Sequence, residues 1–289
     1  MLEAGALPGT VSVLQTNKPG PLTDAALSDE RVGKLSFTGS TGIGKMLLEK
    51  ASQRVLNCSM ELGGNAPFIV LDDADIDAAI DGAMLAKMRN GGQACTAANR
   101  FFVQDKVHDE FVEKLSKRMG ALKVGHGANT ETTLAPLVNR KAVSLVGELV
   151  EDAVQKGATQ LVGGSVTQGP GCYFPATVLG NVSPEARIVK EEVFGPVVAV
   201  VKVKDEFEAL NISNKSEYGL AGYVYTKNLS RGLKVCEQLQ VGMIGLNRGL
   251  VSDPSAPFGG VKQSGLGREG GYEGIDEYLE IKYVATSDF

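Results

Sequence analysis

The stretch "NAPFIVLDDADIDAAIDGAMLAKMRNGGQACTAANRFFVQD", residues 65–105, predicts a strand, a helix and a second strand in succession. It opens with an apolar run that ends at acidic residues typical of a helix start, over residues 65–75. Apolar residues then recur at helical spacing over residues 76–90, and residues 100–105 indicate a strand. Strands that alternate with helices in this way are typical of an α/β fold with a largely parallel sheet.

The rest of the chain repeats this alternation. We predict further strands over 9–15, 34–39, 159–164, 195–204, 220–226 and 241–247, and further helices over 21–29, 41–52, 107–122, 141–158 and 229–239. The strand at 195–204 is almost continuously apolar, which indicates that both of its faces are buried. A chain of 289 residues is long enough for two domains of this class.

Composition argues against several classes of protein. The net charge of −5 disfavours nucleic acid or an anionic membrane as the main partner. We find neither an uninterrupted apolar run of about 18 residues, as a membrane helix needs, nor a signal-peptide pattern at the N-terminus. The four cysteines are widely spaced, which favours a reduced, cytoplasmic protein over a disulfide-bonded one.

Histidine chemistry is poorly supported by the sequence. His108 and His126 both lie in polar segments, and we expect both at the surface. No HExxH pattern occurs, so we predict no metal site. Whatever reaction this protein catalyses, we do not expect a histidine to be its base.

One cysteine stands out by its surroundings. Cys95 follows a predicted helix and comes shortly after Gly91 and Gly92, which would let a substrate approach the backbone. It could equally be a small buried thiol, since free cysteines are among the most buried residues. A nucleophilic thiolate needs a base or a positive field nearby.

Glu61 is a candidate for that base. In "MELGGNAPFIV", residues 60–70, it stands at the entrance to an apolar strand, where burial would raise the pKa of a carboxyl group toward neutrality. The alternative is a surface glutamate at a turn. The two interpretations differ in whether residues 60–70 meet the Cys95 segment in space.

Three further segments are candidates for a ligand site. "FTGSTGIGK", residues 37–45, places Gly39 and Ser40 at a helix N-terminus, where the helix dipole favours a phosphate, although an ordinary capped turn fits equally well. "KEEVFGPVV", residues 190–198, places Glu192 and Phe194 where they could contact a ribose and a ring, or merely lead into a strand. The glycine-rich residues 256–271, "APFGGVKQSGLGREGG", are typical of a loop that lines a site.

Taken in order, these five segments resemble the aldehyde dehydrogenase superfamily. The matching patterns are "FTGSTxxGK", "ELGGNAP", "GGQACxxxxR", "EEVFGPV" and "PFGGVKxSGxGRE", and they span the chain from residue 8 onward. The resemblance implies that Cys95 attacks an aldehyde carbonyl to form a thiohemiacetal. Hydride transfer to NAD or NADP then leaves a thioester, which water activated by Glu61 hydrolyses.

The resemblance also implies roles for the other candidates. Gly39 and Ser40 would lie at the cofactor pyrophosphate, Glu192 at a ribose and Phe194 near the nicotinamide. The segments "KMRNGGQACTAANR" and "GIDEYLEIKYV" are similar to succinate-semialdehyde dehydrogenases. In that branch an arginine six residues before the nucleophile grips the substrate carboxylate, which implies this role for Arg89. The substrate-binding serine of the branch matches Ser252.

The resemblance covers only the C-terminal three-fifths of the family's length. It implies a partial Rossmann-like cofactor domain at 1–63, an α/β catalytic domain at 64–263 and a tail at 264–289. A terminal strand at 279–288 would pair with another subunit and give a homo-oligomer, either a dimer or a tetramer. Two alternatives stay open: a non-catalytic fragment or assembly partner that retains the catalytic domain, and a thiol esterase that needs no cofactor.

Overall fold

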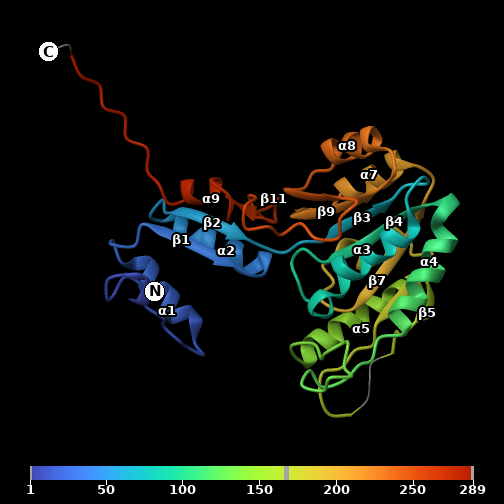
Figure 1. Cartoon of the computed structure of the whole chain (residues 1–289). Helices are drawn as coiled ribbons and strands as arrows, with labels where there is room; N and C mark the ends of the chain where they lie inside the picture. Colours follow the sequence, from blue (N-terminus) through green and yellow to red (C-terminus); the bar gives the residue numbers. More distant parts are fainter. Residues whose placement is uncertain (1, 166–168, 288–289) are drawn as a thin grey trace.

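The computed structural model describes residues 2–165 and 169–287 and is built around a seven-stranded sheet (Figure 1). Its strands are β3 (Ala66–Val70), β4 (Ala98–Gln104), β5 (Thr159–Val162), β6 (Thr177–Gly180), β7 (Val197–Val203), β9 (Ala221–Tyr225) and β10 (Met243–Leu246). They lie in the order β10–β9–β3–β4–β7–β6–β5, and only the β5–β6 pair is antiparallel. The α/β fold class with a largely parallel sheet is therefore confirmed.

Helices cover both faces of this sheet. The first face carries α3 (Ile76–Met88) and α4 (Asp105–Gly120), and the second carries α5 (Arg140–Gln155), α7 (Glu206–Asn214) and α8 (Leu229–Gln238). Successive residues of a strand point to opposite faces, so Phe68 packs in the core under α3 and α4, whereas Ile69 packs in the core under the other three helices. Strand β3 is buried at all five positions for this reason.

A smaller sheet lies beside the large one. Strands β1 (Lys34–Thr38) and β2 (Asn57–Glu61) are parallel, and the two-residue β12 (Gly265–Leu266) adds to β2 in antiparallel orientation. Helices α1 (Pro19–Ser28) and α2 (Thr41–Ser52) accompany this sheet. Its separate apolar cluster contains Leu27, Leu47, Met60 and Leu62.

The remaining short elements connect these layers. They are η1 (Leu2–Ala4), η2 (Arg89–Gly92), α6 (Arg187–Lys190), β8 (Tyr218–Gly219), β11 (Val261–Lys262) and α9 (Glu273–Asp276). Strands β8 and β11 pair with one another in antiparallel orientation. After α9 the chain runs away from the body of the molecule as an extended tail (Figure 1).

Two predicted strands are not formed in this chain. Residues 10–15 contain no strand, and Val11 and Val13 are 58% and 79% exposed, so that prediction was wrong: the alternating pattern has no neighbouring strand to pair with. The predicted strand at 279–288 needs a second subunit as its partner, so a single chain does not test it. Its described part, residues 279–287, forms no strand within the single chain, and its pairing with a second copy stays a prediction.

One side chain lies elsewhere than the sequence indicated. His108 is only 4% exposed, because it faces inward from the first turns of α4, so its predicted surface position was wrong. His126 is exposed as predicted. None of the described helices combines the length and apolar character that a membrane crossing requires.

The packing of Phe68 gives a test of this core. Its ring stacks on those of Phe101 and Tyr225, each with a centroid separation of 4.9 Å. We expect Phe68→Ala to lower the free energy of unfolding by about 3–5 kcal/mol, because a buried aromatic leaves a cavity. Phe207→Ala is the matched control, since Phe207 is 68% exposed and should change that free energy by less than about 0.5 kcal/mol. Urea unfolding measures both, and equal effects would contradict the assigned core.

Candidate active site

Segments from both sheets enclose one pocket with a volume of about 450 Å³. Its lining residues are Thr38, Gly39, Ser40, Glu61, Leu62, Gly63, Gln93, Ala94, Cys95, Glu192 and Phe194. The structure thus brings together the predicted nucleophile, the predicted base and all four predicted cofactor-binding residues. Arg89 and Ser252 are not among the lining residues.

The topology explains why these residues meet. Gly39 and Ser40 follow the carboxyl end of β1, and Glu61 is the last residue of the parallel β2. In contrast, Cys95 precedes β4, and Glu192 and Phe194 precede β7, so they lie at the amino ends of neighbouring parallel strands. The pocket therefore lies between the carboxyl edge of the small sheet and the amino edge of the large one.

Cys95 lies in a loop with unusual backbone geometry. Helix α3 starts at an Asp75 cap, ends at Met88, and is followed by three residues with positive φ: Asn90 (51°), Gly91 (62°) and Gly92 (78°). A Cβ atom on Gly92 would lie 2.2 Å from the carbonyl oxygen of Gly195. We had expected this glycine pair to admit a substrate, but at Gly92 the space is taken by the protein's own backbone.

The thiol of Cys95 is half-buried and does not carry a lowered pKa. Burial raises its pKa most, and the negative charges of Glu192 and Glu61 raise it further. Backbone N–H groups of Cys95 and Thr96 act in the opposite direction. The resting thiol is therefore protonated at neutral pH, and its activation requires a base or an additional positive charge.

Glu61 is a buried carboxyl group with the properties of such a base. It is 5% exposed, and its Oε2 atom has no hydrogen-bond partner among the described residues. Burial, followed by the charge of Glu269, raises its pKa to about 8, against an opposing effect of Arg268. The surface-glutamate interpretation is therefore wrong, and the carboxyl group is poised to exchange a proton near neutral pH.

The two predicted cofactor contacts, Glu192 and Phe194, differ in their exposure. Glu192 Oε1 accepts a hydrogen bond of 2.9 Å from the backbone N–H of Gly64, and burial raises the pKa of this carboxyl group. Phe194 is 42% exposed, although it is an aromatic residue. A ring that stays uncovered beside a pocket offers a face on which a flat ligand can stack.

Ser40 stands at the start of α2. Its backbone is extended (φ −70°, ψ 146°), and its side chain makes no capping hydrogen bond to the helix. The first N–H groups of the 12-residue helix point to this end, where the helix dipole favours an anion. Gly39 precedes it, and a Cβ atom there would lie 2.5 Å from the Phe37 ring.

The predicted substrate residues lie outside the lined pocket. Arg89 is exposed, and its Nη2 atom lies 3.5 Å from the Thr96 hydroxyl, next to the nucleophile. Ser252 is partly buried in the segment that follows β10. Arg89 therefore lies close to Cys95 in space, although it does not line the same cavity.

The sequence did not single out two buried residues that support the site. Ser264 is fully buried, and its hydroxyl donates to the Gly63 carbonyl (2.7 Å) and accepts from the Gly219 N–H (2.9 Å). It fixes the chain directly after Glu61, and the glycine-rich segment 256–271 was the signal for it. The second residue, Lys87, is a buried lysine within the apolar periodicity of α3.

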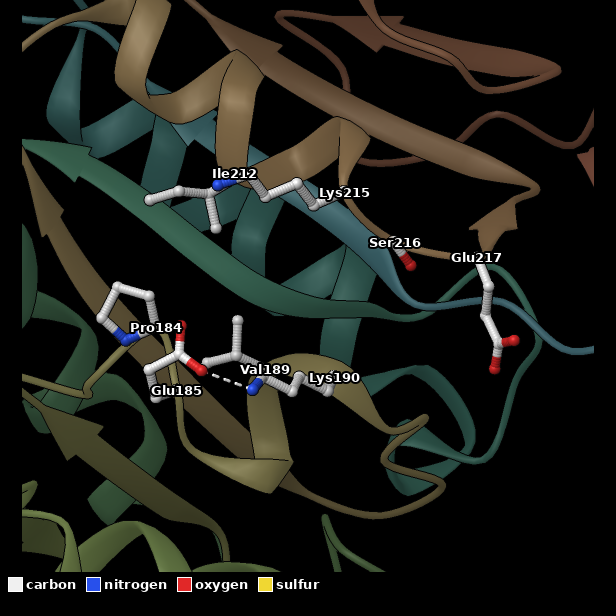
Figure 2. Close-up of a pocket in the computed structure, with 8 residues that line it drawn as sticks. All are labelled: Pro184, Glu185, Val189, Lys190, Ile212, Lys215, Ser216 and Glu217. Atoms are coloured by element: carbon white, nitrogen blue, oxygen red, sulfur yellow. Dashed lines mark hydrogen bonds and ion pairs between the residues drawn. The ribbon is translucent and has the colours of Figure 1, made fainter.

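A second pocket lies apart from these residues. Its volume is about 380 Å³, and it lies between α6 and the end of α7 (Figure 2). Lys190 and Glu185 form an ion pair of 2.6 Å at its edge, and Val189 and Ile212 contribute apolar surface. None of the predicted site residues lines it. Within the described ranges, no group of three or more His, Cys, Asp or Glu side chains is placed to hold a metal ion.

Comparison with known proteins places this fold and site in a class. The family model described as "Aldehyde dehydrogenase family" matches residues 1–284, so the chain belongs to this family. It is 49% identical over 288 residues to a succinate-semialdehyde dehydrogenase of Paenarthrobacter nicotinovorans, covering 100% of this chain and 64% of that protein. It is also 49% identical to a glutarate-semialdehyde dehydrogenase of Pseudomonas putida, covering 98% of this chain and 58% of that protein.

A solved structure gives the same result. The succinate-semialdehyde dehydrogenase from Burkholderia pseudomallei superposes with a TM-score of 0.95 and 45% identity, covering 98% of this chain and 58% of that one. The chain thus spans about three-fifths of the length of these relatives.

The electrostatics of the pocket can be tested on Cys95. Glu192→Gln removes a negative charge beside the thiol while keeping an acceptor for the Gly64 N–H, so we expect the pKa of Cys95 to fall. Alkylation of Cys95 by iodoacetamide at pH 8 should become severalfold faster, because a larger fraction of the thiol is then present as thiolate. Peptide mass spectrometry follows the rate at this cysteine.

The matched control for this test is Glu113→Gln, because Glu113 is exposed on α4 and does not line the pocket. Its alkylation rate should equal that of the unmodified chain. A Glu192→Gln rate that is unchanged, or slower, would contradict the charge coupling between Glu192 and Cys95.

Proposed function

We propose that this protein oxidises an aldehyde to a carboxylic acid, with NAD or NADP as the hydride acceptor. The observation that carries this proposal is the convergence of Cys95, Glu61, Glu192 and Phe194 on a single pocket. A nucleophile, a base of pKa about 8 and two candidate cofactor contacts are what such a reaction requires. Membership of the aldehyde dehydrogenase family supports the same reaction class.

The residues on the cofactor side fit a nicotinamide dinucleotide. The N-terminus of α2 beside Ser40 offers N–H groups and a positive helix end to a pyrophosphate. The Glu192 carboxylate can accept a hydrogen bond from a ribose hydroxyl, and the exposed Phe194 ring can contact a flat heterocycle. When bound, the oxidised cofactor would accept a hydride from the substrate carbon.

The first step is assigned to Cys95. The thiol gives up its proton to Glu61, directly or through a water molecule, and the sulfur forms a bond to the aldehyde carbon. The carbonyl oxygen becomes an alkoxide, which the backbone N–H of Cys95 can stabilise as one donor of an oxyanion hole. Loss of hydride from that carbon restores the C=O bond and leaves a thioester on Cys95.

The second step is assigned to Glu61. Glu61 first releases to solvent the proton that it took from the thiol, and its carboxylate then takes a proton from water, which attacks the thioester carbon. The C–S bond breaks to release the acid, and the proton held by Glu61 returns to the Cys95 thiolate. Because the pKa of Glu61 is about 8, its base form becomes more populated as the pH rises through that value. Glu61 Oε2 has no hydrogen-bond partner among the described residues, so it can accept a hydrogen bond from the attacking water.

The substrate class we propose is a semialdehyde whose far end carries a carboxylate, such as succinate semialdehyde. The relatives named above act on succinate and glutarate semialdehydes, which both carry that group. Arg89 provides the cation, since its guanidinium lies next to Thr96 and thus near the nucleophile. Ser252 is the proposed second contact to this end of the substrate.

The extended tail supports assembly into a homo-oligomer. Leu279, Ile281 and Tyr283 are 58%, 100% and 87% exposed, and they alternate as the residues on one face of a strand do. Apolar side chains left uncovered at this spacing are suited to addition to a sheet edge. We propose a second copy of the chain as the partner.

Turnover tests the proposed reaction. We expect the absorbance of reduced cofactor to rise when the chain receives succinate semialdehyde with NAD or NADP, because Cys95 and Glu61 face one pocket. Cys95→Ala should lower the rate by at least about 10³-fold, since the covalent path is lost. Cys236→Ala is the control, because Cys236 lies on α8 and should leave the rate unchanged. Equal rates for Cys95→Ala and the unmodified chain would contradict the proposal.

A further inference from the structure

The buried lysine on α3 has contacts that its sequence position does not explain. Lys87 lies in the last turn of α3 and has no exposed surface. Lysine is almost never fully buried unless its ammonium group is paired. Burial lowers the pKa of Lys87 to about 7, and the negative charge of Glu192 opposes that decrease.

The ammonium group donates hydrogen bonds to two segments that are far apart in the sequence. Its Nζ donates to Asn99 Oδ1 at 2.7 Å and to the Val193 carbonyl at 3.3 Å. Asn99 lies in β4, four residues after Cys95, and Val193 stands between the two cofactor-side residues Glu192 and Phe194. Lys87 therefore connects the nucleophile segment with the turn that carries those residues.

The stem of the side chain fills the space between these segments. A Cβ atom on Gly92 would lie 2.2 Å from the Gly195 oxygen and 3.2 Å from Lys87 Cε. Residues 89–97, which carry Cys95 and are called the nucleophile loop below, therefore pack directly against the lysine stem and against the turn at residues 192–195. Within residues 2–165 and 169–287, no other hydrogen bond joins residues 193–195 to residues 87–99.

Lys87 does not line the pocket itself, so it has no route to the reacting atoms. We propose that Lys87 is a positioning residue, whose ammonium group holds the turn at residues 192–194 against the nucleophile loop and so sets the distance between the cofactor-side residues and Cys95. The consequence for catalysis rests on the proposed function, whereas the positioning of the turn does not.

Hydrogen–deuterium exchange of the full chain tests the positioning directly. Two amides report on the turn: the Val197 N–H, which donates to the Gly195 oxygen, and the Gly64 N–H, which donates to Glu192. We expect Lys87→Met, which keeps the stem but removes the donors, to accelerate exchange at both amides roughly tenfold or more. The measurement is made at about pH 6, below the Lys87 pKa of about 7, where a charged donor is lost. Amides of β1 and β2 should exchange at unchanged rates.

The matched control is Lys114→Met. Lys114 is a partly exposed residue of α4 that pairs with Asp77 of α3 and Glu110 of its own helix, so the variant removes the same kind of group without touching the turn. Its exchange at Val197 and Gly64 should equal that of the unmodified chain. Unchanged exchange in Lys87→Met, or an equal increase in all strands, would overturn the proposal.

A second variant covers the case in which Lys87→Met fails to fold. Lys87→Ala leaves a space that matches the missing propylamine group, so we expect n-propylammonium to restore slow exchange at Val197, while 1-propanol restores it far less. A purely structural need for apolar filling would give equal rescue by both compounds and would overturn the proposal.

A catalytic readout separates this claim from the proposed function. If the chain turns over succinate semialdehyde, Lys87→Met should lower kcat at least about tenfold while the KM for the aldehyde changes by less than about threefold, since the lysine does not contact substrate. An unchanged kcat together with faster exchange would overturn the catalytic part. Absence of turnover in the unmodified chain would refute the proposed function, and the exchange result would still decide the position of the turn.

Discussion

The site depends on a close approach of backbones that only glycine allows. A Cβ atom on Gly64 would lie 2.4 Å from the Cys95 carbonyl oxygen, and one on Gly92 would lie 2.2 Å from the Gly195 oxygen. A Cβ atom on Gly265 would likewise lie 1.9 Å from the Met60 carbonyl oxygen. The first two approaches place the nucleophile loop between the end of β2 and the turn before β7. Larger residues at these positions would push apart the segments that form the pocket.

This close packing also determines which ionisable groups of the pocket hold a proton. Cys95, Glu61 and Glu192 share a small, poorly solvated volume, and burial raises the pKa of all three groups. The fully buried Lys87 donates a hydrogen bond to the Val193 carbonyl of the turn before β7, and the negative charge of Glu192 acts on its pKa. The resting site is therefore suited to hold protons and to release them when the positively charged nicotinamide ring of the proposed cofactor comes close. Its reactivity follows from this shared environment, since the thiol alone is not activated.

The sequence predicted the fold where the pattern was long and the site where the residue types were distinctive. Helix α3 followed from its apolar periodicity and β7 from its continuous apolar run, but β2, β6 and helix α7 were missed. Strand β2 buries the polar residues Ser59 and Glu61, so it shows no apolar pattern. The strand at 9–15 failed for the opposite reason, since alternation without a partner gives no sheet. The role of Lys87 was out of reach, because burial and pairing across a distant turn depend on tertiary contacts.

The most direct test of the account is to trap an acyl group on the chain. We would incubate the unmodified chain and Glu61→Gln with p-nitrophenyl acetate and map the acetylated residues by peptide mass spectrometry. The account expects acetyl-Cys95 to form more slowly in Glu61→Gln but to persist far longer than in the unmodified chain, because Glu61 is the proposed base both for the thiol and for hydrolysis of the thioester. Acetylation spread evenly over Cys58, Cys95, Cys172 and Cys236, or absent from Cys95, would contradict the assignment of the nucleophile and its base.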